Sequence, residues 1–248
     1  MEHFIALKSL RVDNSKIESI FCLNEISEQQ LNFALEGIDL NILPRMTCLF
    51  VGPKNLVSLQ NLTELKIMRC EKLKIVFSTS IIRCLPHLLK MRIEECKELK
   101  NIIEDDLEDK KSSKTCFPKL GTLVVVMCNK LKYVFPISIC RQLSELNYLI
   151  IRKAAELEEI FVSEGDDLKV EIPNLKFVVF ENLPSLYHVN LPSLYHVQGI
   201  QFQAVKHRFI KNCQKLSLAS ASTADFENDI FGLYYSKFGY GTHSIQYF

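Results

Sequence analysis

The stretch LTELKIMRCEKLKIVF, from Leu62 to Phe77, decides the fold, because its order of apolar and polar residues recurs along the chain. Three later stretches of the same length repeat it: LLKMRIEECKELKNII (88–103), LGTLVVVMCNKLKYVF (120–135) and LNYLIIRKAAELEEIF (146–161). All four fit the pattern L-x-x-[LM]-x-[IV]-x-x-[CA]-x-x-L-[KE]-x-[IV]-[FI]. Internal repeats of this kind indicate a solenoid, in which each repeat packs only against its neighbours.

Weaker copies extend the series towards both ends of the chain. Three of them begin at Leu7, Met46 and Leu175, and a fourth runs from Val205 to Cys213. The cysteine or alanine of the four strong copies recurs after 26, 32 and 26 residues. This spacing is close to the roughly 20 to 29 residue period of leucine-rich repeats. We therefore expect about eight irregular coils.

Each copy also predicts one short strand. Within L-x-x-L-x-I, the last two apolar residues are two positions apart, so both point to the same side of an extended chain. Stacked coils would pair these strands into a parallel sheet with one continuous core. The predicted fold class is an α/β repeat solenoid, a leucine-rich-repeat horseshoe with a parallel β-sheet on its concave side. We assign residues 1–218 to this domain and residues 219–248 to an irregular aromatic tail.

The octapeptide NLPSLYHV occurs twice without a gap, over residues 182–197. In its first copy, Leu183 takes the cysteine position of the repeat and Leu186 takes the next leucine position, as in a normal return segment. The second copy is surplus. Because eight residues are too few for a coil, we expect a longer loop beyond Val189 rather than an added strand.

The overall charge excludes some classes of partner. Lys and Arg number 30 against 29 Asp and Glu, which leaves a formal charge of +1 and no field that attracts nucleic acid or anionic membranes. The longest apolar run, Leu123 to Cys128, is much shorter than the ~20 residues of a membrane span. The N-terminus lacks the pattern of a signal peptide. We expect a cytoplasmic or nucleocytoplasmic protein.

The sequence offers no recognisable catalytic motif. It contains no phosphate loop, no G-x-S-x-G turn and no H-E-x-x-H helix, so we predict no enzymatic activity, no cofactor and no metal. The nine cysteines form no C-x-x-C pair. Four of them share one repeat position, where we expect small buried structural side chains rather than metal ligands or disulfides. These are Cys70, Cys96, Cys128 and Cys213.

The outward positions of the predicted strands suggest a binding surface. Between the two inward residues of each strand lies one outward residue, which is basic in three copies (Arg11, Lys66 and Arg92) and apolar in later ones. Exposed apolar patches commonly mark interfaces. We predict a protein-binding patch flanked by the basic pair Lys66 and Arg92 and made of Val124, Tyr148, Ile150, Phe177, Val179 and Phe209. The alternative is that the tail, or an absent domain, covers these residues.

The repeat pattern, together with strand-leading segments such as FPKLGTL and IPNLKFV, resembles the repeat region of plant nucleotide-binding leucine-rich-repeat immune receptors of the coiled-coil type. The resemblance covers about Leu7 to Leu218. It implies a cytoplasmic sensor whose repeats perceive a pathogen effector or a host protein and restrain a nucleotide switch. The chain lacks the nucleotide-binding module of that family, so nucleotide binding cannot be assigned to any residue here.

Two functions therefore stay open at the level of sequence. The first is an immune-recognition module, whose partner is an effector, a host protein or its own nucleotide-binding domain. The second is a stand-alone adaptor, such as a substrate-recruiting subunit of a ubiquitin ligase. Because the first predicted strand begins within a few residues of Met1 with no capping segment, we expect a fragment of a longer receptor or a truncated product.

Overall fold

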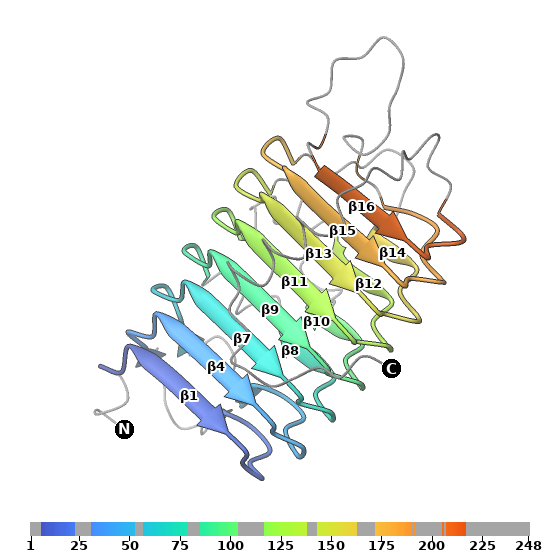
Figure 1. Cartoon of the computed structure of the whole chain (residues 1–248). Coiled ribbons are helices and arrows are strands. Elements are labelled where there is room, and N and C mark those ends of the chain that lie inside the picture. Colours follow the sequence, from blue (N-terminus) through green and yellow to red (C-terminus); the bar gives the residue numbers. More distant parts are fainter. Residues whose placement is uncertain are drawn as a thin grey trace.

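The computed structural model describes residues 6–22, 31–52, 57–78, 85–103, 117–137, 143–162, 172–189, 191, 205 and 207–216. Eight strands of five residues pair in parallel into one sheet, and they lie side by side in the order of the chain (Figure 1). They are β1 (Ser9–Asp13), β4 (Gly37–Asn41), β7 (Glu64–Met68), β9 (Lys90–Glu94), β11 (Thr122–Val126), β13 (Tyr148–Arg152), β15 (Phe177–Glu181) and β16 (His207–Lys211).

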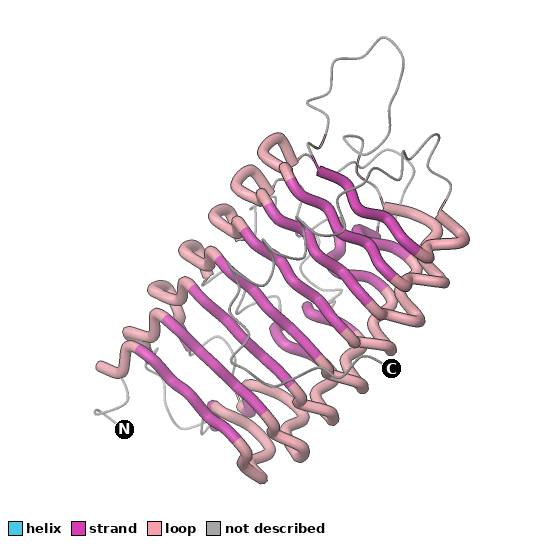
Figure 2. Tube along the Cα trace, in the orientation of Figure 1, coloured by secondary structure: helices cyan, strands magenta, loops and turns pink. Residues whose placement is uncertain are grey.

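Short return strands lie behind this sheet and pair from one coil to the next. They are β2 (Phe21–Cys22), β3 (Leu31–Asn32), β5 (Phe50–Val51), β6 (Val57–Ser58), β8 (Ile75–Phe77), β10 (Asn101–Ile103), β12 (Tyr133–Pro136) and β14 (Glu159–Val162). Four two-stranded parallel sheets result, namely β2 with β5, β3 with β6, β8 with β10, and β12 with β14. Turns and loops join the two layers, as the trace in Figure 2 shows.

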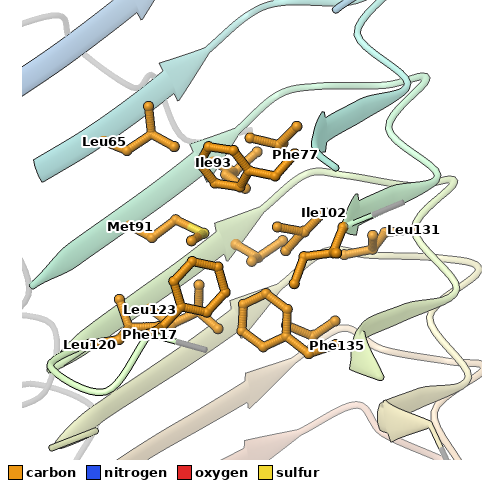
Figure 3. Packing of buried hydrophobic residues seen from close by; sticks show 14 of the residues in the cluster. Leu65, Phe77, Met91, Ile93, Ile102, Phe117, Leu120, Leu123, Leu131 and Phe135 are labelled. Carbon is orange, nitrogen blue, oxygen red and sulfur yellow. The ribbon is translucent and has the colours of Figure 1, made fainter. Parts of the chain in front are cut away.

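The hydrophobic core fills the space between the long strands and the return strands. The inward residues of the eight-stranded sheet, such as Ile93 and Leu123, are fully buried against return-strand residues such as Ile102 (Figure 3). Phenylalanine rings complete this layer: the Phe117 ring lies 5.5 Å from that of Phe135 and 6.4 Å from that of Phe77. Each coil thus buries its apolar residues only by stacking on its neighbours, as the repeat pattern requires.

A left-handed corner follows every strand of the eight-stranded sheet. The residue directly after each strand has a φ between 49° and 56°, from Asn14 to Asn212, although none of the eight is glycine. The N–H of this residue donates to a strand-end carbonyl of the next coil, as in Met127 N to Arg152 O at 2.9 Å. The corner therefore extends the hydrogen-bonded ladder by one step and turns the chain towards the return side.

The structure confirms the predicted solenoid of parallel strands. The described residues contain strands, turns and loops and no helix, so the α component of the predicted α/β class has no counterpart among them. The number of complete coils and the horseshoe shape stay predictions. The predicted boundary at residue 218, the tail 219–248 and the second NLPSLYHV copy, apart from Leu191, lie outside the described residues.

The position predicted for the second strand was wrong. The copy beginning at Met46 places Phe50 and Val51 on the sheet, but they form β5 on the return side, where the Phe50 ring stacks on Phe21 at 5.0 Å. The second strand of the sheet is β4, whose inward residues are Ile38 and Leu40. The sequence signal was missed because a leucine, Leu43, occupies the cysteine position of this coil.

Candidate functional site

Three residues of each long strand point away from the core, because side chains alternate along a strand. We call the surface that they form the outer face. The parallel register aligns them into three rows. The first row is Ser9, Gly37, Glu64, Lys90, Thr122, Tyr148, Phe177 and His207. The middle row is Arg11, Asp39, Lys66, Arg92, Val124, Ile150, Val179 and Phe209. The last row is Asp13, Asn41, Met68, Glu94, Val126, Arg152, Glu181 and Lys211.

The middle row carries a second hydrophobic cluster, separate from the main core. Val124, Ile150 and Val179 pack together on adjacent strands, with Val126 beside them and the half-buried Phe209 at one end. Their exposed fractions are 1% for Val124, 4% for Ile150 and 5% for Val179. This apolar part of the outer face, which we call the outer cluster, is therefore buried in the folded chain.

Aromatic rings stack along the first row beside the outer cluster. The Tyr148 and Phe177 rings are nearly parallel with centroids 4.8 Å apart, and the His207 ring stacks on Phe177 at 4.5 Å. The spacing follows from the register, which places the three residues directly opposite one another on β13, β15 and β16. All three are half-buried, so the stack presents part of its surface to solvent.

The other half of the outer face is polar and hollowed. A cavity of about 440 Å³ lies over β1 to β11, and among its lining residues are Asp39, Glu64, Lys66, Lys90 and Arg92. The Lys66 Nζ lies 3.7 Å from one carboxylate oxygen of Asp39. The other oxygen of Asp39 is buried and lacks a hydrogen-bond partner among the described residues. The basic side chains at this hollow, Lys66, Lys90 and Arg92, make it suited to an acidic group.

Two ion pairs lie on the outer face, one within β9 and one that joins β13 to β15. Arg92 Nε donates to Glu94 Oε1 at 2.8 Å, and both side chains are nearly buried, with 11% and 3% exposed. Arg152 Nε donates in the same way to Glu181 Oε2 on the next strand. Charges held this far out of water need such pairing, since an unpaired buried charge costs several kcal/mol.

The structure brings all the predicted binding residues onto one face. Lys66 and Arg92 lie at the hollow, Val124, Ile150, Val179 and Phe209 form the outer cluster, and Tyr148 and Phe177 belong to the aromatic stack. That these residues bind a partner stays a prediction. Sequence reasoning missed Asp39, because the second strand was misplaced, and the whole last row. A signal for that row was available, since its members directly follow the second inward residue of each strand.

The repeat cysteines form a buried column behind the corners. Cys70, Cys96 and Cys128 are fully buried, while Cys213 is half-buried, and each thiol donates to a carbonyl two residues earlier in the chain. The neighbouring Cys96 thiol, and then burial, raise the pKa of the Cys70 thiol, and the Cys128 thiol does the same for the pKa of Cys96. Burial also raises the pKa of Cys213. Thiols of this kind stay protonated and are poor nucleophiles.

The described part of the chain contains neither a cluster of metal-binding side chains nor a membrane-spanning helix. No group of three or more His, Cys, Asp or Glu residues gathers there in a way that could hold a metal ion. Within the same residues, no helix is long and apolar enough to cross a membrane.

Comparison with known proteins identifies the repeats. A family model described as plant disease resistance protein RPS2-like, leucine-rich repeats, matches residues 1–97 and again residues 97–225. No curated protein and no solved structure matches the chain. The two matches together cover the solenoid from β1 to β16.

Proposed function

Because the chain belongs to the RPS2-like leucine-rich-repeat family of plant disease resistance proteins, we propose that it is an immune-recognition module that binds a protein partner through its outer face. Solenoids present extended surfaces to macromolecules, and each added coil lengthens the surface. The partner is a pathogen effector, a host protein or a nucleotide-binding domain that the repeats restrain. The module has no enzymatic role of its own and acts in the cytoplasm.

The observation that carries this proposal is the division of the outer face into two chemically different halves. The half over β11 to β16 holds the outer cluster and the aromatic stack, whereas the charged residues of the hollow, which reaches β11, lie on β4, β7 and β9. Solvent-facing positions tolerate almost any polar residue, so the fold alone does not require apolar and aromatic residues at four successive strands. Interfaces, by contrast, favour such residues at their centre and polar residues at their rim.

The geometry also indicates how a partner would engage. Tyr148, Phe177 and Lys66 are partly accessible and offer the first contacts, one apolar and one charged. Flat aromatic rings held rigid by stacking bury much area at little entropic cost, which is typical of residues that dominate binding energy. A fitting partner segment would place an apolar side chain on the aromatic stack and a carboxylate near Lys66 and Lys90.

The test is to substitute the accessible residues of this face and to measure which proteins no longer associate with the chain. The full chain, fused to a proximity-labelling enzyme, would be expressed in leaf cells as wild type, as Tyr148→Asp with Phe177→Asp, and as Tyr187→Asp. Tyr187 is exposed on the return side and serves as the matched control. Circular dichroism of the purified variants verifies that each is folded.

We expect a defined set of proteins to be labelled by the wild type and by Tyr187→Asp but not by the double variant. If the double variant labels the same proteins to the same extent, the outer face is not the contact surface. A ubiquitin-ligase adaptor would use the same face, and the labelled set would then contain other ligase subunits. Immune-receptor domains or pathogen proteins in the set support the recognition role.

A further inference from the structure

The first row of the outer face changes its chemistry across four neighbouring strands, β9 to β15 (Figure 1). Strand pairing places Lys90, Thr122, Tyr148 and Phe177 directly opposite one another, each on the next strand of the sheet. Lys90 is exposed, and Tyr148 and Phe177 are half-buried. This part of the row therefore offers a partner a positive charge at one end and two aromatic rings at the other.

Lys90 is the basic side chain of the hollow that is open to a new ion pair. Lys66 Nζ already lies 3.7 Å from a carboxylate oxygen of Asp39, and Arg92 is held in a nearly buried ion pair. Among the described residues, none forms an ion pair with Lys90. Glu64, opposite Lys90 on β7, repels a further carboxylate on that side. An acidic group of a partner is therefore favoured at Lys90, on the side that faces β11.

The two aromatic rings form a platform at a fixed distance from this charge. The centroids of the Tyr148 and Phe177 rings are 4.8 Å apart, and the ring planes differ by 7°. Aromatic contacts add to the gain from burial alone, so such a platform is best covered by another aromatic or a large aliphatic side chain. Thr122, which lies between the charge and the platform, has a shorter side chain than Lys90 or Tyr148 on either side.

The spacing of the strands sets the distance between the two contacts. At about 4.8 Å per strand, Lys90 lies two spacings, about 10 Å, from Tyr148 and three spacings, about 14 Å, from Phe177. In an extended chain, side chains on one face are separated by about 7 Å when they are two residues apart, by about 13 Å at four residues and by about 20 Å at six. Of these separations, only four residues fits the interval.

A helical partner segment fits the row less well. At 1.5 Å per residue, a helix would need about seven to nine residues to cover the same distance, and it is about 10 to 12 Å across. It would therefore also lie over the middle row, where Val124 and Ile150 are already buried and offer little further surface. An extended segment can follow the first row alone.

We propose that the partner presents an extended segment that crosses β9 to β15, with an acidic residue at Lys90 and an aromatic or large aliphatic residue, four positions away, on Tyr148 and Phe177. This inference rests on the proposed function and deepens it, because it states which peptide chemistry the outer face recognises. The charge fixes one end of the segment, and the platform selects the residue at the other end.

The experiment selects binders of the purified full chain from a displayed library of peptides with twelve random residues. The same library is selected on Lys90→Glu and on the matched control Lys72→Glu, which reverses the charge of an exposed lysine in the turn after β7. Circular dichroism verifies that each variant is folded. Sequencing of each pool counts how often an acidic residue and an aromatic or large aliphatic residue occur two to nine positions apart, in either order.

On the wild type and on Lys72→Glu, pairs four positions apart should be enriched about fivefold over pairs at any other separation. This ratio corresponds to about 1 kcal/mol, the upper range for an exposed ion pair. On Lys90→Glu, a basic residue should replace the acidic one at the same separation, because the charge at the contact is reversed. A different preferred separation, no enriched pair, or an unchanged acidic preference on Lys90→Glu would overturn the inference.

The selection and the labelling experiment can fail separately. Loss of labelling in the Tyr148→Asp and Phe177→Asp double variant without the predicted peptide pair would leave the outer face as the contact surface and remove the extended acidic segment as its ligand. The predicted pair together with unchanged labelling would show that the face recognises such peptides but is not the contact surface for partners in the cell.

Discussion

At position 127, glycine should give a more stable protein than alanine, although glycine usually weakens a folded chain. Met127 occupies the left-handed corner after β11, with a φ of 56°, and its side chain is 40% exposed. A left-handed backbone costs an ordinary L-residue about 1 to 2 kcal/mol through the contact of Cβ with the carbonyl oxygen, and glycine avoids this cost. Glycine loses about 0.5 to 1 kcal/mol more than alanine through its greater freedom in the unfolded chain.

The difference between these two numbers sets the expected size of the effect. Met127→Gly should exceed Met127→Ala in unfolding free energy by about 0.5 to 1 kcal/mol. For a chain of this length, such a gain raises the melting temperature by about 1 to 4 °C. Comparing glycine with alanine, rather than with methionine, isolates the effect of Cβ, since both substitutions remove the methionine side chain.

The assay is thermal and urea unfolding of both variants, followed by circular dichroism. The control pair is Lys90→Gly and Lys90→Ala, at an exposed position within β9 where φ is not positive. There, glycine should be less stable than alanine by about 0.5 to 1 kcal/mol. The reasoning is refuted if glycine is the worse residue at both positions, because the corners would then carry no steric strain.

Two further predictions concern the interior. First, the pKa values of the Cys70 and Cys96 thiols are raised in the folded chain, so the unfolded chain releases these protons at a lower pH. The contribution of the two protonated thiols to the unfolding free energy is therefore complete below about pH 9. Above that pH the unfolding free energy declines by up to about 1.4 kcal/mol per pH unit for each thiol. Urea unfolding between pH 7 and 10.5 measures this decline, and Cys70→Ala with Cys96→Ala should flatten it; an unchanged slope would mean that the thiols do not cause it. Second, Leu123→Ala, at a fully buried inward position of β11, should lower the unfolding free energy by about 2 to 5 kcal/mol, whereas the exposed Leu89→Ala should lower it by less than about 1 kcal/mol.

The inward side of the fold could be predicted from the sequence because it follows one rule. Residues two apart in L-x-x-L-x-I share a face, and seven of the eight strands of the sheet lie where this spacing places them. The exception, β4, satisfies the same spacing through Leu35, Ile38 and Leu40 but has a leucine at the cysteine position. A second apparent match at Met46 competed with it, and only long-range pairing with β1 and β7 decides between the two.

The outer face could be predicted only in part. The register of the strands follows from the repeats, so the residues of each row can be predicted once the strands are placed. The exposure of each row is not predictable in this way, because the repeat pattern does not encode that Val124, at an outward position, is only 1% exposed. The pairing of Arg92 with Glu94 is also hidden, since outward residues two apart can interact with each other or with the next strand.

Each residue of the outer face has a position that is defined by its coil and by its row. A substitution at one outward position changes one strand's width of the surface, about 4.8 Å, and does not alter the inward residues that form the main core. The gain or loss of an entire coil would instead move every later outward residue by one strand along the sheet. Substitutions at exposed outer positions such as Lys90 can thus change the chemistry of this surface one position at a time, whereas outer positions such as Val124 and Arg92 are also constrained by packing and ion pairing.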